Sequence, residues 1–322
     1  MKGTRWLTTT ALAVAIGASL VGCASSSAQR DSSKIQIEAS LYPLQWLSEQ
    51  VGGSNVEVRS LARPGVEPHH LELAPKEFAR VHDADLLVMI KGFQPAIDDA
   101  VAGMDNKVFD AATFNHVTIV DDTQNDHDHD HDDHDGGHSE ASHDGHDHGS
   151  VDPHLWLDPT VFSDVAVGLA DRLAEMDPSN ADAYRSRGAK VVQLLASIDD
   201  NYREALGACE SRYLVTSHSA FGSLARRYNF QQIGIARSAA EMEPSPSHLA
   251  EIAEMVADKD VRTIYVEPLG SEGLTRTVAK ETGAAIAVLD PIETITDDSA
   301  AEDYGALMAV NLETLVEGQR CK

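Results

Sequence analysis

Short apolar runs rich in β-branched residues alternate with amphipathic helical patterns along most of the chain. The helical spacing of apolar residues predicts helices at 75–82, 247–257, 272–282 and 302–315. The runs predict strands at residues 34–39, 56–61, 86–90, 117–120, 213–217, 231–235, 263–267 and 285–289. This alternation is typical of parallel sheets covered by helices, so the predicted fold class is α/β.

One stretch, residues 179–207, breaks the alternation. It has no strand pattern, it follows Pro178, and it places Tyr184, Val191 and other apolar residues at helical spacing. A helix of about 27 residues would be roughly 40 Å long, about the width of a domain. We therefore expect two parallel-sheet α/β lobes, residues 34–178 and 208–322, joined by one long rigid helix over 179–207. The alternative is a helix packed inside a single larger domain.

The N-terminus indicates export. A basic segment precedes an apolar stretch at residues 7–20 that is short for a membrane span. Leu20-Val21-Gly22-Cys23 resembles the bacterial lipobox. We therefore expect a lipoprotein signal peptide at 1–22, lipidation of Cys23 and a flexible tether at 23–33, which would hold the protein outside the cytoplasm on the cell membrane. The alternative is an ordinary signal peptide with an incidental cysteine.

Charge and cysteine content narrow the possible partners and sites. The formal net charge of −27 argues against binding to nucleic acid or to anionic lipid. Besides Cys23, only Cys209 and Cys321 remain, and in an oxidising compartment two such cysteines are more often bridged than free. We therefore expect a disulfide between them. Neither belongs to a CxxC pair, which disfavours a cysteine-type zinc site.

A tract rich in histidine and aspartate occupies residues 126–148. It contains no apolar residue larger than alanine, so we expect a disordered loop over 121–150. Imidazoles beside carboxylates are good ligands for zinc and similar metals, so we expect an accessory metal collector rather than a primary site. The alternatives are a solvated acidic linker and a cloning tag. The tract holds eight of the 15 histidines: His127, His129, His131, His134, His138, His143, His146 and His148.

Three motifs outside the tract offer histidines to a tetrahedral metal site. The loop Arg63-Pro-Gly-Val-Glu-Pro-His-His70 is stiffened by its prolines, and His69 and His70 compete as its ligand. Asp-Pro-His-Leu-Trp-Leu-Asp-Pro places His154 between two prolines. Thr-Ser-His-Ser-Ala-Phe-Gly places His218 after a strand, where ligands collect in open α/β sheets.

A carboxylate is expected as the fourth ligand. Asp290 follows the predicted strand at 285–289, and Glu267 at the end of another strand competes with it. His82 and His248 lie in predicted helices with charged neighbours, so we expect them to be solvated. His116 stays open.

Several motifs, in chain order, resemble the zinc and manganese substrate-binding proteins of bacterial ABC importers. They are the lipobox, PGVEPHHLELAPKE, DPHLWLDP, the DPSNxxxY run, TSHSAFGSLARRY, EPSPS and LDP, and the resemblance covers essentially the whole chain after the tether. It implies a metal site in a cleft between two lobes, with the ligands His69, His154, His218 and Asp290. The manganese branch usually carries Glu where His218 stands, and three imidazoles with one carboxylate suit Zn²⁺ better than Mn²⁺. The doubled His69-His70 departs from the usual pattern and leaves the choice between them open.

The predicted function is to capture Zn²⁺ outside the cytoplasm and deliver it to an ABC permease driven by its ATPase. We expect a monomeric, lipid-anchored binding protein that is not an enzyme. The alternatives are a manganese-specific homologue, a secreted zinc hydrolase, and a zinc buffer or adhesin that uses the tract alone. A hydrolase needs an open coordination position and a general base, and the sequence contains neither HExxH nor a nucleophile elbow.

Overall fold

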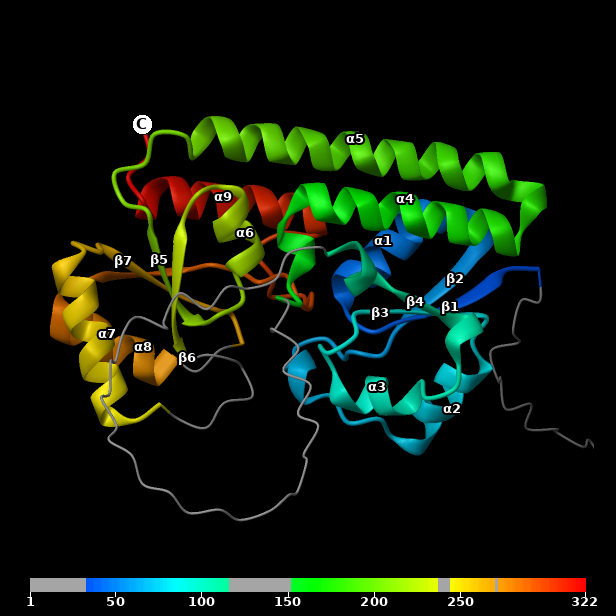
Figure 1. The fold of residues 1–322 in the computed structure, drawn as a ribbon, viewed down its shortest axis with the longest axis horizontal. Coiled ribbons are helices and arrows are strands. Elements are labelled where there is room, and N and C mark those ends of the chain that lie inside the picture. Colours follow the sequence, from blue (N-terminus) through cyan, green and yellow to red (C-terminus); the bar gives the residue numbers. More distant parts are fainter. Residues whose placement is uncertain (1–32, 116–151, 237–243, 270–271) are drawn as a thin grey trace, which may run out of the picture. The chain divides into compact units, whose positions relative to one another are not determined.

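Two parallel sheets carry the fold in the computed structural model (Figure 1), which describes residues 33–115, 152–236, 244–269 and 272–322. The predicted signal peptide, Cys23, the tether, the strand at 117–120, His116 and the His-rich tract lie outside these residues. In the described parts of the chain, no helix combines the length and the hydrophobicity that crossing a bilayer requires.

The first sheet has the strand order β2-β1-β3-β4, and all its pairs are parallel. Its strands are β1 (Ile35–Ala39), β2 (Val56–Ser60), β3 (Leu86–Met89) and β4 (Val108–Asp110), and its helices are α1 (Tyr42–Gly52), α2 (Pro75–Asp83) and α3 (Pro95–Ala100). Every residue of the inner strand β3 is buried, as expected of a strand covered on both faces. The short strand β4 was not predicted.

The second sheet repeats this topology with the order β6-β5-β7-β8, again all parallel. Its strands are β5 (Tyr213–His218), β6 (Gln231–Ala236), β7 (Thr263–Val266) and β8 (Ala285–Val288). Its helices are α6 (Gly222–Arg227), α7 (Pro246–Asp258), α8 (Glu272–Thr282) and α9 (Tyr304–Gly318). The predicted fold of two parallel-sheet α/β lobes with a long helix is confirmed.

The long helix α5 (Ala181–Ala205) is 25 residues long and follows a 3-10 turn at Pro178–Asn180. It lies beside a second long helix that was not predicted, α4 (Pro159–Met176), and the two green helices run together in Figure 1. Gly188 of α5 allows this close approach, because a Cβ at this position would lie 2.8 Å from the Cβ of Ala170. The helix is therefore part of a packed pair and not an isolated rod.

The start of α4 explains part of the DPHLWLDP motif. Asp158 is the N-cap, and its carboxylate accepts hydrogen bonds from the backbone N–H groups of Thr160 and Val161. Pro159 occupies the first turn, where its missing N–H costs nothing. Trp156 is fully buried, and its Nε1 donates to the carbonyl oxygen of Pro291 at 2.7 Å. The motif therefore fixes α4 to the segment that follows β8.

One continuous hydrophobic core joins the two lobes and the helix pair. It contains Leu44 of α1, Leu195 of α5, Leu214 of β5 and Met308 of α9. The rings of Trp46 and Tyr304 pack against each other within it at a tilt, with centroids 4.7 Å apart. The positions of the loops at the ends of the two sheets are therefore set by shared packing.

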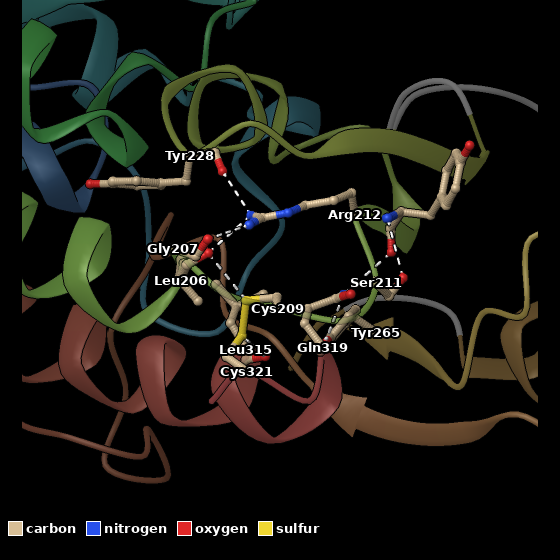
Figure 2. The surroundings of a disulfide bond; sticks show 11 residues. Leu206, Gly207, Cys209, Ser211, Arg212, Tyr228, Tyr265, Leu315, Gln319 and Cys321 are labelled. Atoms are coloured by element: carbon tan, nitrogen blue, oxygen red, sulfur yellow. Dashed lines mark hydrogen bonds between the residues drawn. A yellow bond between two sulfur atoms is a disulfide. The ribbon is translucent and has the colours of Figure 1, made fainter.

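Cys209 and Cys321 form the predicted disulfide (Figure 2). It joins the turn after α5 to the residues that follow α9. Beside it, Nε2 of Gln319 donates to the carbonyl oxygen of Tyr213 at 3.3 Å and to the hydroxyl of Tyr265 at 3.1 Å. The disulfide therefore holds the end of α9 to the turn after α5, and the two hydrogen bonds hold it to β5 and β7.

Replacing both cysteines by alanine should destabilise the fold. The bridged residues are 112 positions apart, and in the loop-entropy model such a link restrains the unfolded chain by roughly 4–5 kcal/mol. Thermal unfolding should show a lower Tm for the double variant than for the oxidised wild type, and the reduced wild type should match the variant. Two titratable thiols in the unreduced, denatured mature protein would contradict the bridge.

Candidate metal centre

Four side chains from four separate segments meet at one place. His69, His154, His218 and Glu293 offer ligand atoms that all lie within 4.8 Å of one another. His69 follows β2, His154 precedes α4, His218 ends β5, and Glu293 follows β8. The group therefore takes side chains from both lobes, and it lies in the cleft between them.

The spacing of three of these atoms suits a tetrahedral cation. Nε2 of His154 lies 3.3 Å from Nε2 of His69 and 3.1 Å from Oε1 of Glu293. Nε2 of His69 lies 3.2 Å from the same oxygen. Ligand atoms about 2.0–2.1 Å from a tetrahedral Zn²⁺ would be about 3.3 Å apart. The three atoms already stand at about this separation.

His218 completes the group with an unpartnered nitrogen. Its Nδ1 lies 2.6 Å from Oε2 of Glu267, whereas its Nε2 is buried and has no hydrogen-bond partner. A buried polar atom without a partner costs free energy. A cation bound to Nε2 would remove that cost, so the residues present fit a metal ion.

Two buried carboxylates contact the Nδ1 atoms of His154 and His218. Oδ1 of Asp152 lies 2.9 Å from Nδ1 of His154, and Glu267 contacts Nδ1 of His218. The hydroxyl of Ser223 donates to Asp152 at 2.8 Å, and that of Ser217 donates to Glu267 at 2.7 Å. Because a carboxylate accepts the proton of Nδ1, the Nε2 lone pair of each ring is left for a cation.

The imidazoles and carboxylates of this group shift one another's pKa values. Burial alone would lower the pKa of His154, but its hydrogen bonds with Asp152 and Glu293 outweigh burial and raise this pKa to about 10. Burial would raise the pKa of Glu293, yet the hydrogen bonds with His154 and His69 hold it well below its usual range. The pKa of Asp152 is likewise lowered, because its hydrogen bonds and ion pair with His154 outweigh burial. Both carboxylates therefore favour the protonated, positively charged form of His154.

A small hollow beside the centre is lined by further carboxylates, those of Glu67, Glu267 and Asp290. Burial, followed by the charge of Glu293, raises the pKa of Glu67. Burial, followed by the charges of Glu293 and Glu267, raises the pKa of Asp290 to about 6. The negative potential of these groups favours the approach of a cation.

The structure brings together three of the four predicted ligands, and the fourth position differs. Asp290 is not in the group, and its Oδ1 accepts a hydrogen bond from the backbone N–H of Ile292 at 2.7 Å. The chain turns after β8 and carries Glu293 into the centre instead. His70 is exposed outside the group, and Glu267 contacts His218 from behind.

Sequence reasoning missed Glu293 and Asp152. Glu293 stands two positions beyond the Leu-Asp-Pro motif, and no spacing rule marks it. Asp152 was visible as the first residue of the Asp-Pro-His motif, where an acidic residue two positions before a ligand is a signal for an imidazole partner. His82 and His248 lie outside the group.

The family model described as zinc-uptake complex component A, periplasmic, matches residues 37–318. The chain belongs to this family. Zinc-binding protein AdcA of Streptococcus pyogenes serotype M3 is 32% identical over 293 residues, which are 88% of this chain and 55% of AdcA. High-affinity zinc uptake system protein ZnuA of Bacillus subtilis is 28% identical over 295 residues, which are 90% of this chain and 89% of that protein.

A solved structure of another family member has the same fold. The Zn(II)-bound ZnuA-like domain of Streptococcus pneumoniae AdcA matches with a TM-score of 0.70 and 27% identity, over 89% of this chain and 99% of that domain. The chain spans only a little over half of the Streptococcus pyogenes AdcA that it matches. The family is one of solute-binding transport components.

Binding of a divalent cation at this centre should release protons. The carboxylates of Asp152 and Glu293 raise the pKa of His154 to about 10, which favours a proton on this ring that the cation must replace. At about pH 7, calorimetry in two buffers of different ionisation enthalpy should give different heats, corresponding to about one proton released per cation. Identical heats, together with an affinity that does not fall on acidification, would contradict this protonation state.

The same proton affects the cation-free protein. The pKa of His154 in the fold, about 10, lies above the ordinary value of 6.5. We therefore expect protonation of His154 to contribute fully to the stability of the fold below about pH 6.5, and we expect this contribution to be lost as the pH rises through about 10.

Proposed function

We propose that this protein captures Zn²⁺ outside the cytoplasm and delivers it to an ABC permease driven by a cytoplasmic ATPase. The observation that carries the proposal is the convergence of three imidazoles and one carboxylate within 4.8 Å. A site rich in imidazole nitrogen suits Zn²⁺, whereas Mn²⁺ prefers more oxygen ligands. The names of the relatives, zinc-binding AdcA and zinc-uptake ZnuA, support the same cation.

We propose His69, His154, His218 and Glu293 as the ligands, with Glu293 in place of the predicted Asp290. Four protein ligands close a tetrahedral shell and leave no position for a reactive water. This argues for binding and against the secreted hydrolase. The cation would lie between the lobes that we assign to residues 34–178 and 208–322, with residues 179–207 as the linking helix.

The N-terminal motif and the family support the proposed location and partners. Cleavage after residue 22 and lipidation of Cys23 would anchor a monomeric protein to the outer face of the cell membrane. The tether at 23–33 would let the cleft reach the permease. The family is described as periplasmic, which supports an extracytoplasmic location.

Single replacement of a proposed ligand should greatly weaken zinc binding. His154→Ala and His218→Ala each leave an incomplete shell, so the loss should exceed the roughly 10- to 100-fold typical of residues that only support a ligand. Calorimetry on the mature protein lacking residues 126–148 isolates the tight site. His82→Ala is the matched control and should bind like the parent protein, because His82 is an exposed histidine outside the group. Wild-type affinity in either ligand variant would refute the assignment.

Deleting Asp126–His148 should lower the number of bound zinc ions and leave one tight site. Ordering each ligand would cost conformational entropy, so the eight imidazoles of this tract should bind weakly. Equilibrium dialysis should show that the extra ions are lost, and uptake by cells should slow most when zinc is scarce. Loss of the tight site in the deletion variant would place the tract within the primary shell.

A further inference from the structure

The turn after β8 contains a residue with a left-handed backbone conformation. Ile292 has a φ of 59° and is fully buried. A β-branched side chain rarely adopts this left-handed region, because its Cβ crowds the backbone. Such a conformation persists only where the surroundings determine it strongly, and such residues gather at functional sites. The next residue along the chain is Glu293.

The carboxylate of Asp290 is one group that holds this turn. Its Oδ1 accepts a hydrogen bond from the backbone N–H of Ile292 at 2.7 Å, which is the Asx-turn geometry of Asp and Asn side chains. Asn311 of α9 holds the backbone of Asp290 on both sides. Its Oδ1 accepts from the N–H at 2.9 Å, and its Nδ2 donates to the carbonyl oxygen at 2.7 Å.

The other side of the turn is attached to the first lobe and to the DPHLWLDP motif. The carbonyl oxygen of Pro291 accepts from Nε1 of Trp156 at 2.7 Å, and that of Glu293 accepts from the N–H of Tyr42 at 3.3 Å. Trp156 stands two residues after His154. The backbone that carries Glu293 is therefore held relative to the imidazole that its side chain meets.

We propose that Asp290 is a positioning residue, which fixes the left-handed turn at Ile292 and so directs the carboxylate of Glu293 to His69 and His154. The inference rests on the proposed zinc function, and it assigns to Asp290 a role in the same site without contact to the cation. Loss of the Asx turn would let Ile292 relax to negative φ. The carboxylate of Glu293 would then leave its place at 3.1 and 3.2 Å from the two imidazoles.

A replacement series at position 290 separates positioning from ligation. Asn keeps the side-chain oxygen that accepts from Ile292 but removes the charge, Ser keeps a weaker acceptor, and Ala has none. We expect zinc affinity near the wild-type value in Asp290→Asn, an intermediate value in Asp290→Ser, and a loss of about 10- to 100-fold in Asp290→Ala. Glu293→Gln provides the reference for loss of the ligand itself. All variants carry the deletion of residues 126–148.

The visible absorption of bound Co²⁺ gives a readout that a general loss of stability would not move. The intensity and wavelength of this absorption depend on the ligands of the cation. The spectrum of Asp290→Asn should therefore match that of the wild type, and the spectrum of Asp290→Ala should shift toward that of Glu293→Gln. Thermal unfolding without metal identifies variants that do not fold. If Asp290→Ala does not fold, the zinc affinities of the other two variants still test the inference. Asp290→Asn should then bind Zn²⁺ more tightly than Asp290→Ser.

Two outcomes would overturn the inference. If Asp290→Asn loses as much affinity as Glu293→Gln, Asp290 is a ligand and not a positioning residue. If Asp290→Ala binds Zn²⁺ and Co²⁺ like the wild type, the turn does not depend on Asp290. Absence of zinc binding by the wild-type protein would instead refute the proposed function, and the inference with it.

Discussion

The candidate metal centre depends on the contacts of the buried imidazole of His154. It lies between Asp152 and Glu293, and burying a charged group is tolerable only where partners surround it. Asp152 connects this ring to Ser223 on α6, and Glu293 connects it to the segment after β8. The side chain of His154 thus connects α6 with the segment that follows β8, and both belong to the second lobe. A cation that replaces the proton on Nε2 of His154 would leave Asp152 and Glu293 as partners of this site.

The rest of the fold fixes the positions of the four segments that carry the proposed ligands. The two sheets share one strand order, and β5 carries His218 at its carboxyl end, where α/β folds usually place their ligands. The paired helices α4 and α5, together with the continuous core, fix one lobe against the other. The disulfide and Gln319 fix the end of α9. Asn311 within the same helix then holds the turn that carries Glu293.

Much of the fold could be predicted from periodicity, because buried parallel strands are nearly continuous apolar runs. The strands from β5 to β8 begin at the predicted residues, and α8 has the predicted bounds. The three-residue strand β4 was too short to give a pattern, and the helix α4 was not predicted. The histidines could be predicted because prolines and strand ends mark their loops. Glu293 could not, since its place depends on a left-handed Ile292, and no residue preference indicates that conformation.

X-ray absorption at the zinc edge tests the central claim most directly. The sample is the mature protein lacking residues 126–148, loaded with one equivalent of Zn²⁺, so that only the cleft site is occupied. The account predicts four light-atom neighbours at about 2.0–2.1 Å, with the multiple scattering of three imidazoles and no sulfur. A six-coordinate, oxygen-rich shell, or a shell with fewer than three imidazoles, would contradict it.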